Sequence, residues 1–184
     1  ASWPQGALHT RAMFLVKDPN DVTNPLAYRV LKIASIIYRK WGSLRLRHMK
    51  KWIAQWDEAF TNAGVPAKCA QDAWLQEAIY LEYAKINNIP TTGGGIDIYK
   101  CFDQINKELI YKLALHAGMP HRVVGAYSSF LENMKVHYQT GEYVGPAHTD
   151  RCSIPQGCPF SMAMLAMITT VWGRIMVDMH VRPR

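Results

Sequence analysis

The chain has 184 residues, 49% of them apolar and 19% charged, which excludes an intrinsically disordered protein and suits one domain with its own core. Its formal net charge of +7 favours a polyanionic partner such as nucleic acid. The longest apolar run, residues 159–172, is too short to cross a bilayer, so no membrane association is expected. Four cysteines without a C-x-x-C pair favour a reducing, intracellular location.

The N-terminal third predicts two strands followed by a long helical segment. MFLVK (residues 13–17) and YRVLKI (residues 28–33) have the composition of strands, and the turn-rich loop DPNDVTNP follows the first of them. From Ser35 onwards apolar residues recur at helical spacing as far as Phe60. We therefore expect a β-ribbon that leads into a helix.

This helical segment carries a dense positive charge. Residues 39–51 (RKWGSLRLRHMKK) contain six cations and no acid: Arg39, Lys40, Arg45, Arg47, Lys50 and Lys51. A solvated helix face is one interpretation, but a run without acids cannot pair its charges internally, and Trp41 and Trp52 lie among them. We favour contact with a nucleic-acid backbone, which would weaken as salt rises.

Helical periodicity returns three times in the middle of the chain. The segments are residues 71–88, 103–120 and 122–134. Asp72 and Asp103 are the expected N-caps of the first two helices. Between these helices, IPTTGGGIDI (residues 89–98) should lead into a short strand that ends near Asp97.

The C-terminal third predicts a hairpin, a loop and a helix. KVHYQTGEYVGP (residues 135–146) should turn at Thr140-Gly141. SIPQGCPFSM (residues 153–162) then holds a glutamine between a proline that restricts φ and a glycine that frees it. A helix is expected from about Ser161 to Met176. Helices with short strands and no regular β–α alternation predict an α+β fold.

Asp97 is the carboxylate whose surroundings best suit chemistry. An acid at a strand end, after three glycines that permit close approach of another backbone, suits a hard cation such as Mg²⁺ together with phosphate oxygens. A solvated strand end for Asp97 and a helix cap for Asp103 are the structural alternatives. We call residues 153–160 the glutamine loop. Cys152 and Cys158 lie on either side of its Pro155-Gln156-Gly157 turn, but two cysteines without a histidine pair make no metal site.

Four motifs, taken together, resemble reverse transcriptases. DIYKCFD (residues 97–103) resembles the family's first catalytic motif, and SIPQGCPFSM resembles its Pro-Gln-Gly motif, although Ser153 stands where the family usually has glycine. The two N-terminal strand segments resemble the fingers strands. QDAWLQEAIYLEYA (residues 71–84) is similar to the helix between fingers and palm in non-LTR retrotransposon and group II intron enzymes. The motifs occur in the family's order and span most of the chain.

The resemblance implies a right-hand polymerase fold. Residues 1–92 would form a fingers subdomain with a helical insertion, and residues 93–184 a partial palm whose antiparallel sheet is flanked by helices. The family's Asp-Asp motif and its thumb are not found, and Asp178 is single and too early to replace that pair. The chain therefore resembles a fragment of a longer polyprotein, which would supply the thumb and an endonuclease.

The resemblance also implies a reaction: deoxynucleotides are added to a DNA primer on an RNA template with two Mg²⁺ or Mn²⁺ ions. Asp97 would bind both ions, the Ile98 carbonyl would be a further ligand, and Phe102 would exclude a ribose 2′-hydroxyl. The remaining nucleotide contacts would come from Lys17, Arg29, Gln156 and Gly157. One carboxylate cannot hold two ions, so we expect this chain by itself to be inactive.

Two other functions remain open. In an RNA-dependent RNA polymerase the second acid of the first motif would read the ribose 2′-hydroxyl, but Phe102 and the Pro-Gln-Gly loop favour the reverse transcriptase. A non-catalytic module could keep the polymerase scaffold only to bind RNA or a protein. An Asp-Asp pair just beyond Arg184 would favour the enzyme over the module.

Overall fold

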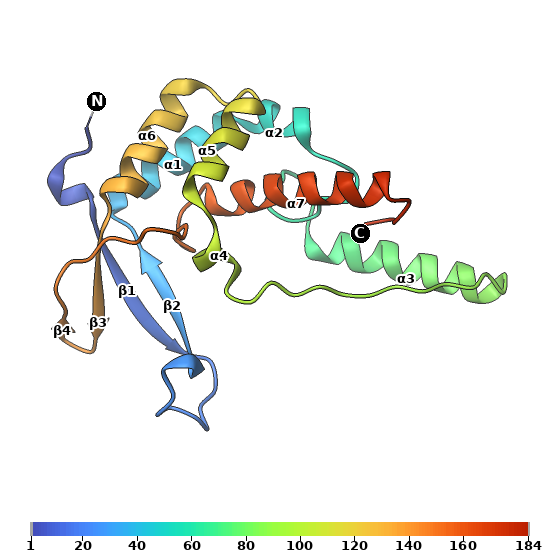
Figure 1. Cartoon of the computed structure of the whole chain (residues 1–184), viewed down its shortest axis with the longest axis horizontal. Coiled ribbons are helices and arrows are strands. Elements are labelled where there is room, and N and C mark those ends of the chain that lie inside the picture. The colour runs from blue at the N-terminus through green and yellow to red at the C-terminus, as the bar shows by residue number, and fades with distance from the viewer. Residues whose placement is uncertain (1, 184) are drawn as a thin grey trace.

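The computed structural model describes residues 2–183, apart from the side chain of Pro25. These residues form seven α-helices, two short 3-10 helices and four strands (Figure 1). The helices are α1 (Ile36–His48), α2 (Lys50–Trp56), α3 (Ala70–Ile86), α4 (Cys101–Gln104), α5 (Lys107–His116), α6 (His121–Asn133) and α7 (Ser161–Asp178). The strands and 3-10 helices are β1 (His9–Val16), β2 (Tyr28–Ile33), β3 (Lys135–Thr140), β4 (Tyr143–Val144), η1 (Gln5–Ala7) and η2 (Pro25–Ala27). The predicted α+β class is confirmed.

The four strands form one mixed sheet in the order β2-β1-β3-β4. β1 pairs antiparallel with β2, from Arg11 opposite Ile33 to Val16 opposite Tyr28, and β3 pairs antiparallel with β4. The central pair, β1 and β3, is parallel. Within residues 93–184 the strands β3 and β4 pair antiparallel, as expected for that part of the chain. Their parallel pairing with β1 was not expected, and it arises because a long crossover through α1 to α6 returns the chain to the same end of the sheet.

Several predicted elements have different bounds. β1 begins at His9, four residues earlier than expected, and the predicted helix over residues 35–60 is two helices that meet at Met49. The strand expected near Asp97 does not form, since residues 89–98 have no regular secondary structure. Their three glycines and one proline explain this, because glycine packs no side chain and proline donates no backbone hydrogen bond.

Two predicted helix caps are also corrected. Cys69 is the N-cap of α3, and Asp72 lies in the first turn, where its carboxylate accepts a 2.7 Å hydrogen bond from the Cys69 amide. That bond lowers the pKa of Asp72. Asp103 lies in the single turn of α4, and Asn106 caps α5 by accepting from the Glu108 and Leu109 amides at 2.9 and 3.3 Å. An asparagine directly before a helix satisfies two free amides.

The expected hairpin and C-terminal helix do form. β3 ends at Thr140 and β4 begins at Tyr143, so the chain turns at Gly141, which has φ +59°. Glycine suits this left-handed backbone. α7 begins at Ser161 as predicted and ends two residues later than expected, at Asp178.

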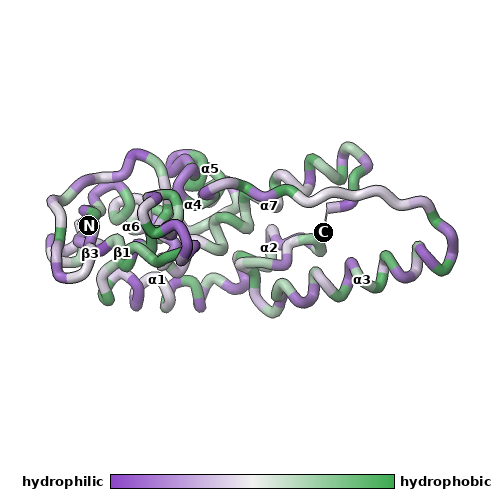
Figure 2. The backbone as a smooth tube through the Cα atoms, turned by 90° about the horizontal axis from the view of Figure 1, so that it is seen from below, coloured by the Kyte–Doolittle hydropathy of each residue, from purple (hydrophilic) through white to green (hydrophobic). Residues whose placement is uncertain are grey.

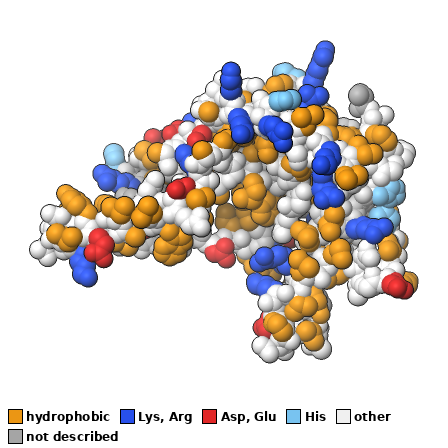
Figure 3. All heavy atoms as spheres, turned by 180° about the vertical axis from the view of Figure 1, so that it is seen from behind, with side chains coloured by type: hydrophobic (Ala, Val, Ile, Leu, Met, Phe, Trp, Pro, Cys, Tyr) orange, Lys and Arg blue, Asp and Glu red, His pale blue; other side chains and the backbone are white. Residues whose placement is uncertain are grey.

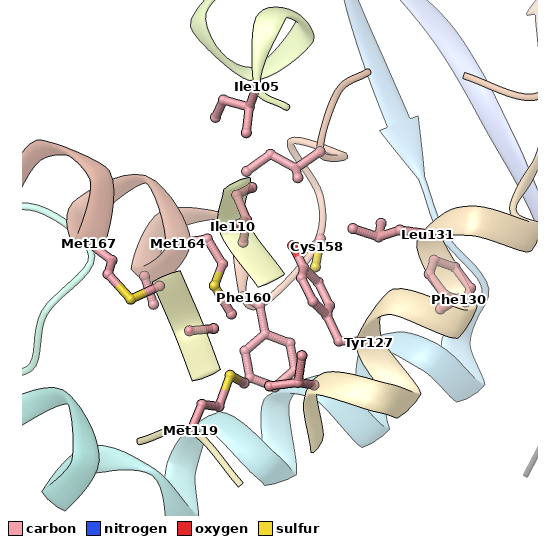
Figure 4. Close-up of a cluster of buried hydrophobic side chains, with 14 of the residues drawn as sticks. Ile105, Ile110, Met119, Tyr127, Phe130, Leu131, Cys158, Phe160, Met164 and Met167 are labelled. Atoms are coloured by element: carbon pink, nitrogen blue, oxygen red, sulfur yellow. The ribbon is translucent and has the colours of Figure 1, made fainter. Parts of the chain in front are cut away.

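The main apolar core lies where α5, α6 and α7 meet the loop before α7 (Figure 4). Ile110, Tyr127, Phe160 and Met164 are all fully buried there. The Tyr127 and Phe160 rings meet edge to face, with centroids 5.4 Å apart. The C-terminal end of the glutamine loop is thereby anchored in the core.

α3 and the segment that follows it, residues 87–100, extend away from the rest of the molecule, and we call them the arm (Figures 1 and 2). Ala84 is the one buried residue of α3. Trp74 is 77% exposed, although it lies in one of the most regular helical patterns of the sequence. Within residues 2–183 no helix is long and apolar enough to cross a membrane.

Candidate functional site

The two motifs that the sequence singled out, residues 97–103 and 153–162, lie side by side. The Ser153 amide donates a 3.0 Å hydrogen bond to the Ile105 carbonyl, and the Ile154 amide donates one of 3.0 Å to the Phe102 carbonyl. Ser153, Ile154 and Pro155 are buried. The first turn after Asp97 and the loop that leads to Gln156 are thus held together through their backbones.

The loop is also anchored behind Gln156. The buried Cys158 thiol lies 3.0 Å from the hydroxyl of Tyr38 in α1. Burial raises the pKa of this thiol, so Cys158 stays protonated and serves packing rather than chemistry. The Ser161 hydroxyl donates a 2.6 Å hydrogen bond to the Pro155 carbonyl, which closes the turn before α7.

Ser153 adopts a backbone conformation that favours glycine. Its φ is +95°, a region that costs a residue with a Cβ about 1–3 kcal/mol. Its hydroxyl, however, accepts a 2.7 Å hydrogen bond from the Lys32 ammonium group. A bond to a charged group contributes about 1.5–3 kcal/mol, which offsets the strain. The serine is therefore compatible with a position where the resembled family has glycine.

Lys32, from β2, is the centre of a buried polar network. Its residue is 6% exposed, and its ammonium group lies 2.7 Å from Asp150 Oδ2 and 3.7 Å from Asp103 Oδ1. Asp150 Oδ1 in turn lies 3.6 Å from His148 Nε2. The network joins β2, α4 and the loop after β4, which are distant in sequence. Asp150 is the close partner of Lys32, whereas Asp103 lies farther away and its side chain is 41% exposed.

Two glycines let the loop fit between β2 and α1. A Cβ at Gly157 would lie 2.9 Å from the Lys32 carbonyl oxygen, closer than side-chain carbons approach backbone oxygens. A Cβ at Gly42 of α1 would lie 3.2 Å from the Pro159 ring. Gly157 is thus required by close approach to β2, not by an unusual φ.

A groove of about 720 Å³ runs between α1 and this loop. The loop wall is Gln156, Gly157, Cys158 and Pro159, and the α1 wall is Ile36, Arg39, Lys40, Ser43, Leu44 and Arg47. We call it the basic groove. The structure therefore brings three of the six predicted basic residues together with the predicted glutamine and glycine.

The other three predicted cations, Arg45, Lys50 and Lys51, are exposed on α1 and α2 but do not line the basic groove. Figure 3 shows one face of the molecule, on which Lys and Arg side chains gather over the body while hydrophobic side chains cover the arm. Of the six cations predicted to form one basic surface, three therefore line the groove and three lie exposed beside it.

Asp97 lies in the irregular segment before α4 and is exposed, as is Ile98. Burial, and to a smaller extent the negative charge of Asp97, raises the pKa of the Cys101 thiol. Within residues 2–183 no group of three or more His, Cys, Asp or Glu side chains could hold a metal ion. Asp103, the other carboxylate of the motif, lies 3.7 Å from the Lys32 ammonium group and its side chain is 41% exposed.

Phe102 packs partly against the core, and its carbonyl bonds the loop. Lys17 and Arg29 are exposed near the far end of the β1–β2 ribbon. Arg29 pairs with Leu15, whereas Lys32 pairs with Ala12, so strand alternation puts Arg29 and Lys32 on opposite faces of the sheet. Lys17 and Arg29 are therefore not brought to the basic groove.

Sequence reasoning missed the buried cations and their partner. Besides Lys32, the nearly buried Lys107 donates to the carbonyls of Leu131 and Asp150 at 3.1 and 2.6 Å. A signal for Lys32 existed, because strand alternation puts it on the same face as Val30, which packs against the core. For Lys107 and Asp150 we find no comparable sequence pattern.

No protein-family model matches this chain, and no curated protein sequence matches it. The resemblance to reverse transcriptases therefore rests on the motifs themselves. The contacts between the first motif and the glutamine loop are the geometry on which a function can be argued.

Proposed function

We propose that this chain forms the fingers and part of the palm of an RNA-directed DNA polymerase, and that its basic groove binds the template–primer. The observation that carries the proposal is the pair of backbone hydrogen bonds from Ser153 and Ile154 to Ile105 and Phe102. They hold the segment after Asp97 against the loop before Gln156. A nucleotide pocket that uses both motifs needs this proximity.

The charge of the basic groove supports a nucleic-acid ligand. Arg39, Lys40 and Arg47 lie on one wall, and the opposite wall presents the half-buried Gln156. Phosphate groups are bound by such cations without sequence preference. A side-chain amide can both donate and accept hydrogen bonds, so Gln156 would contact the base or sugar of a nucleotide rather than its phosphate.

Magnesium, when bound to the complete enzyme, would neutralise phosphate charge and activate the primer hydroxyl. In this chain Asp97 is the one carboxylate of the motif that the resemblance assigns to the ions, and it is exposed. We therefore expect the chain to bind a template–primer and a nucleotide without extending the primer.

Fluorescence anisotropy with a labelled RNA–DNA template–primer tests the groove. Affinity should fall steeply with salt, and Lys40→Ala and Arg47→Ala should each reduce the slope of log affinity against log salt by about one. Lys112→Ala, which removes an exposed cation on α5, is the matched control and should leave the slope unchanged. Unchanged slopes for both groove variants would contradict the proposal.

Nucleotide binding separates the polymerases from the second candidate, a non-catalytic module. With Mg²⁺ present, a deoxynucleotide should bind more tightly than its ribonucleotide, and Phe102→Ala should reduce the difference. Equal binding of both nucleotides would favour an RNA polymerase. Template–primer binding without nucleotide binding would favour the module. A thermal melt of Phe102→Ala controls for folding.

A further inference from the structure

We propose that the outward face of the sheet, at the start of the paired strands β1 and β3, binds a phosphate group. The first observation is the alternation of burial along these strands. Thr10 and Val136 are fully buried, so their neighbours in each strand point to the other face. Four residues that can carry positive charge share that face, and we call them the cationic cluster: His9, Arg11, Lys135 and His137.

The second observation is that groups of like charge stand opposite one another in this cluster. His9 is the register partner of Lys135, and Arg11 is the register partner of His137. Neighbouring strands are only about 4.8 Å apart, so opposite side chains interact, and like charges destabilise the pairing. An anion bound between the two strands would remove this repulsion.

No acid within residues 2–183 neutralises the cationic cluster. Neither Arg11 nor Lys135 forms an ion pair with a described residue, and the strands of the sheet contain no Asp or Glu. Glu132 precedes Lys135 by three residues, but its carboxylate accepts a 2.9 Å hydrogen bond from the Tyr111 hydroxyl of α5. A ligand is therefore the source of the counter-charge.

The two histidines of the cluster form an ordered hydrogen-bond chain. His137 Nδ1 lies 3.1 Å from the Gly145 carbonyl oxygen, which can only accept, so Nδ1 carries the proton. In the neutral ring His137 Nε2 then accepts, and His9 Nδ1, 2.9 Å away, donates to it. His9 Nε2 can therefore take up a proton without breaking either bond, which adds a donor to the exposed face.

A phosphate group suits these donors in charge and in number. A guanidinium group binds two phosphate oxygens side by side, and an ammonium group or a protonated imidazole binds a further one. Residues on one face of a strand are about 6.6 Å apart, so long side chains from both strands can converge on one phosphate. The phosphodiester backbone of a nucleic acid and a small phosphate compound share this chemistry.

The cationic cluster is separate from the basic groove. Lys32, whose carbonyl lies against the glutamine loop, pairs in register with Ala12 and so belongs to the inward face of the sheet, with Thr10. The cluster belongs to the outward face. The inference is therefore independent of the proposed polymerase function, and a failure of one leaves the other standing.

The ring signals of His9 and His137 in NMR spectra report binding at the cluster directly. Inorganic sulfate, whose charge is constant across about pH 5–8, is the probe for a small dianion, and a short single-stranded oligonucleotide without terminal phosphates is the probe for the backbone. At least one probe should shift both signals saturably. The probe that binds more tightly identifies the source of the phosphate, and no saturable shift with either probe would overturn the proposal.

Two charge-removing variants test the cationic side chains. Arg11→Gln and Lys135→Gln should each raise the dissociation constant of the tighter probe at least about tenfold, because each removes a charge-assisted hydrogen bond. Arg122→Gln in α6 and Lys112→Gln in α5 remove the same charges at other exposed positions and should leave it unchanged. Thermal unfolding without a probe should show no loss of stability in the cluster variants, since each removes a repulsion. Equal effects of cluster and control variants would contradict the proposal.

The pH dependence tests the histidine chain. The tighter probe should bind more strongly at about pH 5.5 than at about pH 7.5, because His9 gains a donor while Arg11, Lys135 and the hydrogen bond to His137 stay as they are. His9→Asn keeps a donor for His137 but has no group that takes up a proton, so this variant should lose the pH dependence. A wild-type affinity that is equal at both pH values would overturn the role of His9 and with it the proposed site.

Discussion

α7 and α3 are the two longest helices of the molecule, with 18 and 17 residues, yet their surroundings differ fully. α7 buries seven residues: Ser161, Ala163, Met164, Ala166, Met167, Thr170 and Gly173. α3 buries only Ala84. α7 follows directly from the anchored loop, whereas α3 is joined to the body by irregular segments at both ends. Both helices form from local periodicity, but only the helix that follows an anchored segment packs into the core.

The two regions also differ in how polar groups are used. In the body, Lys32 is buried and paired with Asp150 across a long stretch of chain. In the arm, the clearest polar contact is local, between Asp72 and the Cys69 amide. The body should therefore lose much stability when one polar partner is removed, and the arm should lose little.

The largest expected effect is that of Lys32→Met. The substitution leaves the Asp150 carboxylate, 17% exposed, without its cation, which should lower the free energy of unfolding by about 3–5 kcal/mol. Lys85→Met, on the exposed surface of α3, should change it by less than about 0.5 kcal/mol. Urea unfolding measures both. Adding Asp150→Leu to Lys32→Met should recover much of the lost stability. Equal losses for Lys32→Met and Lys85→Met would show that the arm depends on its polar groups as much as the body does.

Truncation of one apolar side chain in each helix should give the next largest difference. Met164→Ala in α7 removes a fully buried side chain and should cost about 2–5 kcal/mol. Leu81→Ala in α3 removes one that is 50% exposed and should cost less than about 0.5 kcal/mol. If thermal unfolding gives the two variants the same loss, α3 is packed in solution as α7 is.

The smallest expected effect concerns Ser153. Ser153→Ala loses the hydrogen bond to Lys32 but keeps the strained φ of +95°, and should cost about 1.5–3 kcal/mol. Ser153→Gly loses the same bond and relieves the strain, so it should cost about 1 kcal/mol less. Chemical denaturation of the pair measures the strain directly. A glycine variant less stable than the alanine variant would show that the backbone is not strained.

Local patterns predicted most elements of this fold. The four helices from α3 to α7 other than the single turn of α4, the strand β2 and the β3–β4 hairpin all lie where periodicity and turn residues put them. The errors lay at the helix caps, at the start of β1, at Met49, where the predicted helix divides, and in the glycine segment. Asn106, not Asp103, caps α5 because its side chain reaches two free amides.

By itself the sequence determined the class of elements, the order of the motifs and the positive charge of residues 39–51, because these depend on neighbours along the chain. Only the tertiary structure decided that β1 and β3 pair in parallel and that α1 and the glutamine loop form one groove. It also decided that Lys32 bonds Ser153 across 121 residues. Such contacts depend on long-range packing, to which no local period corresponds.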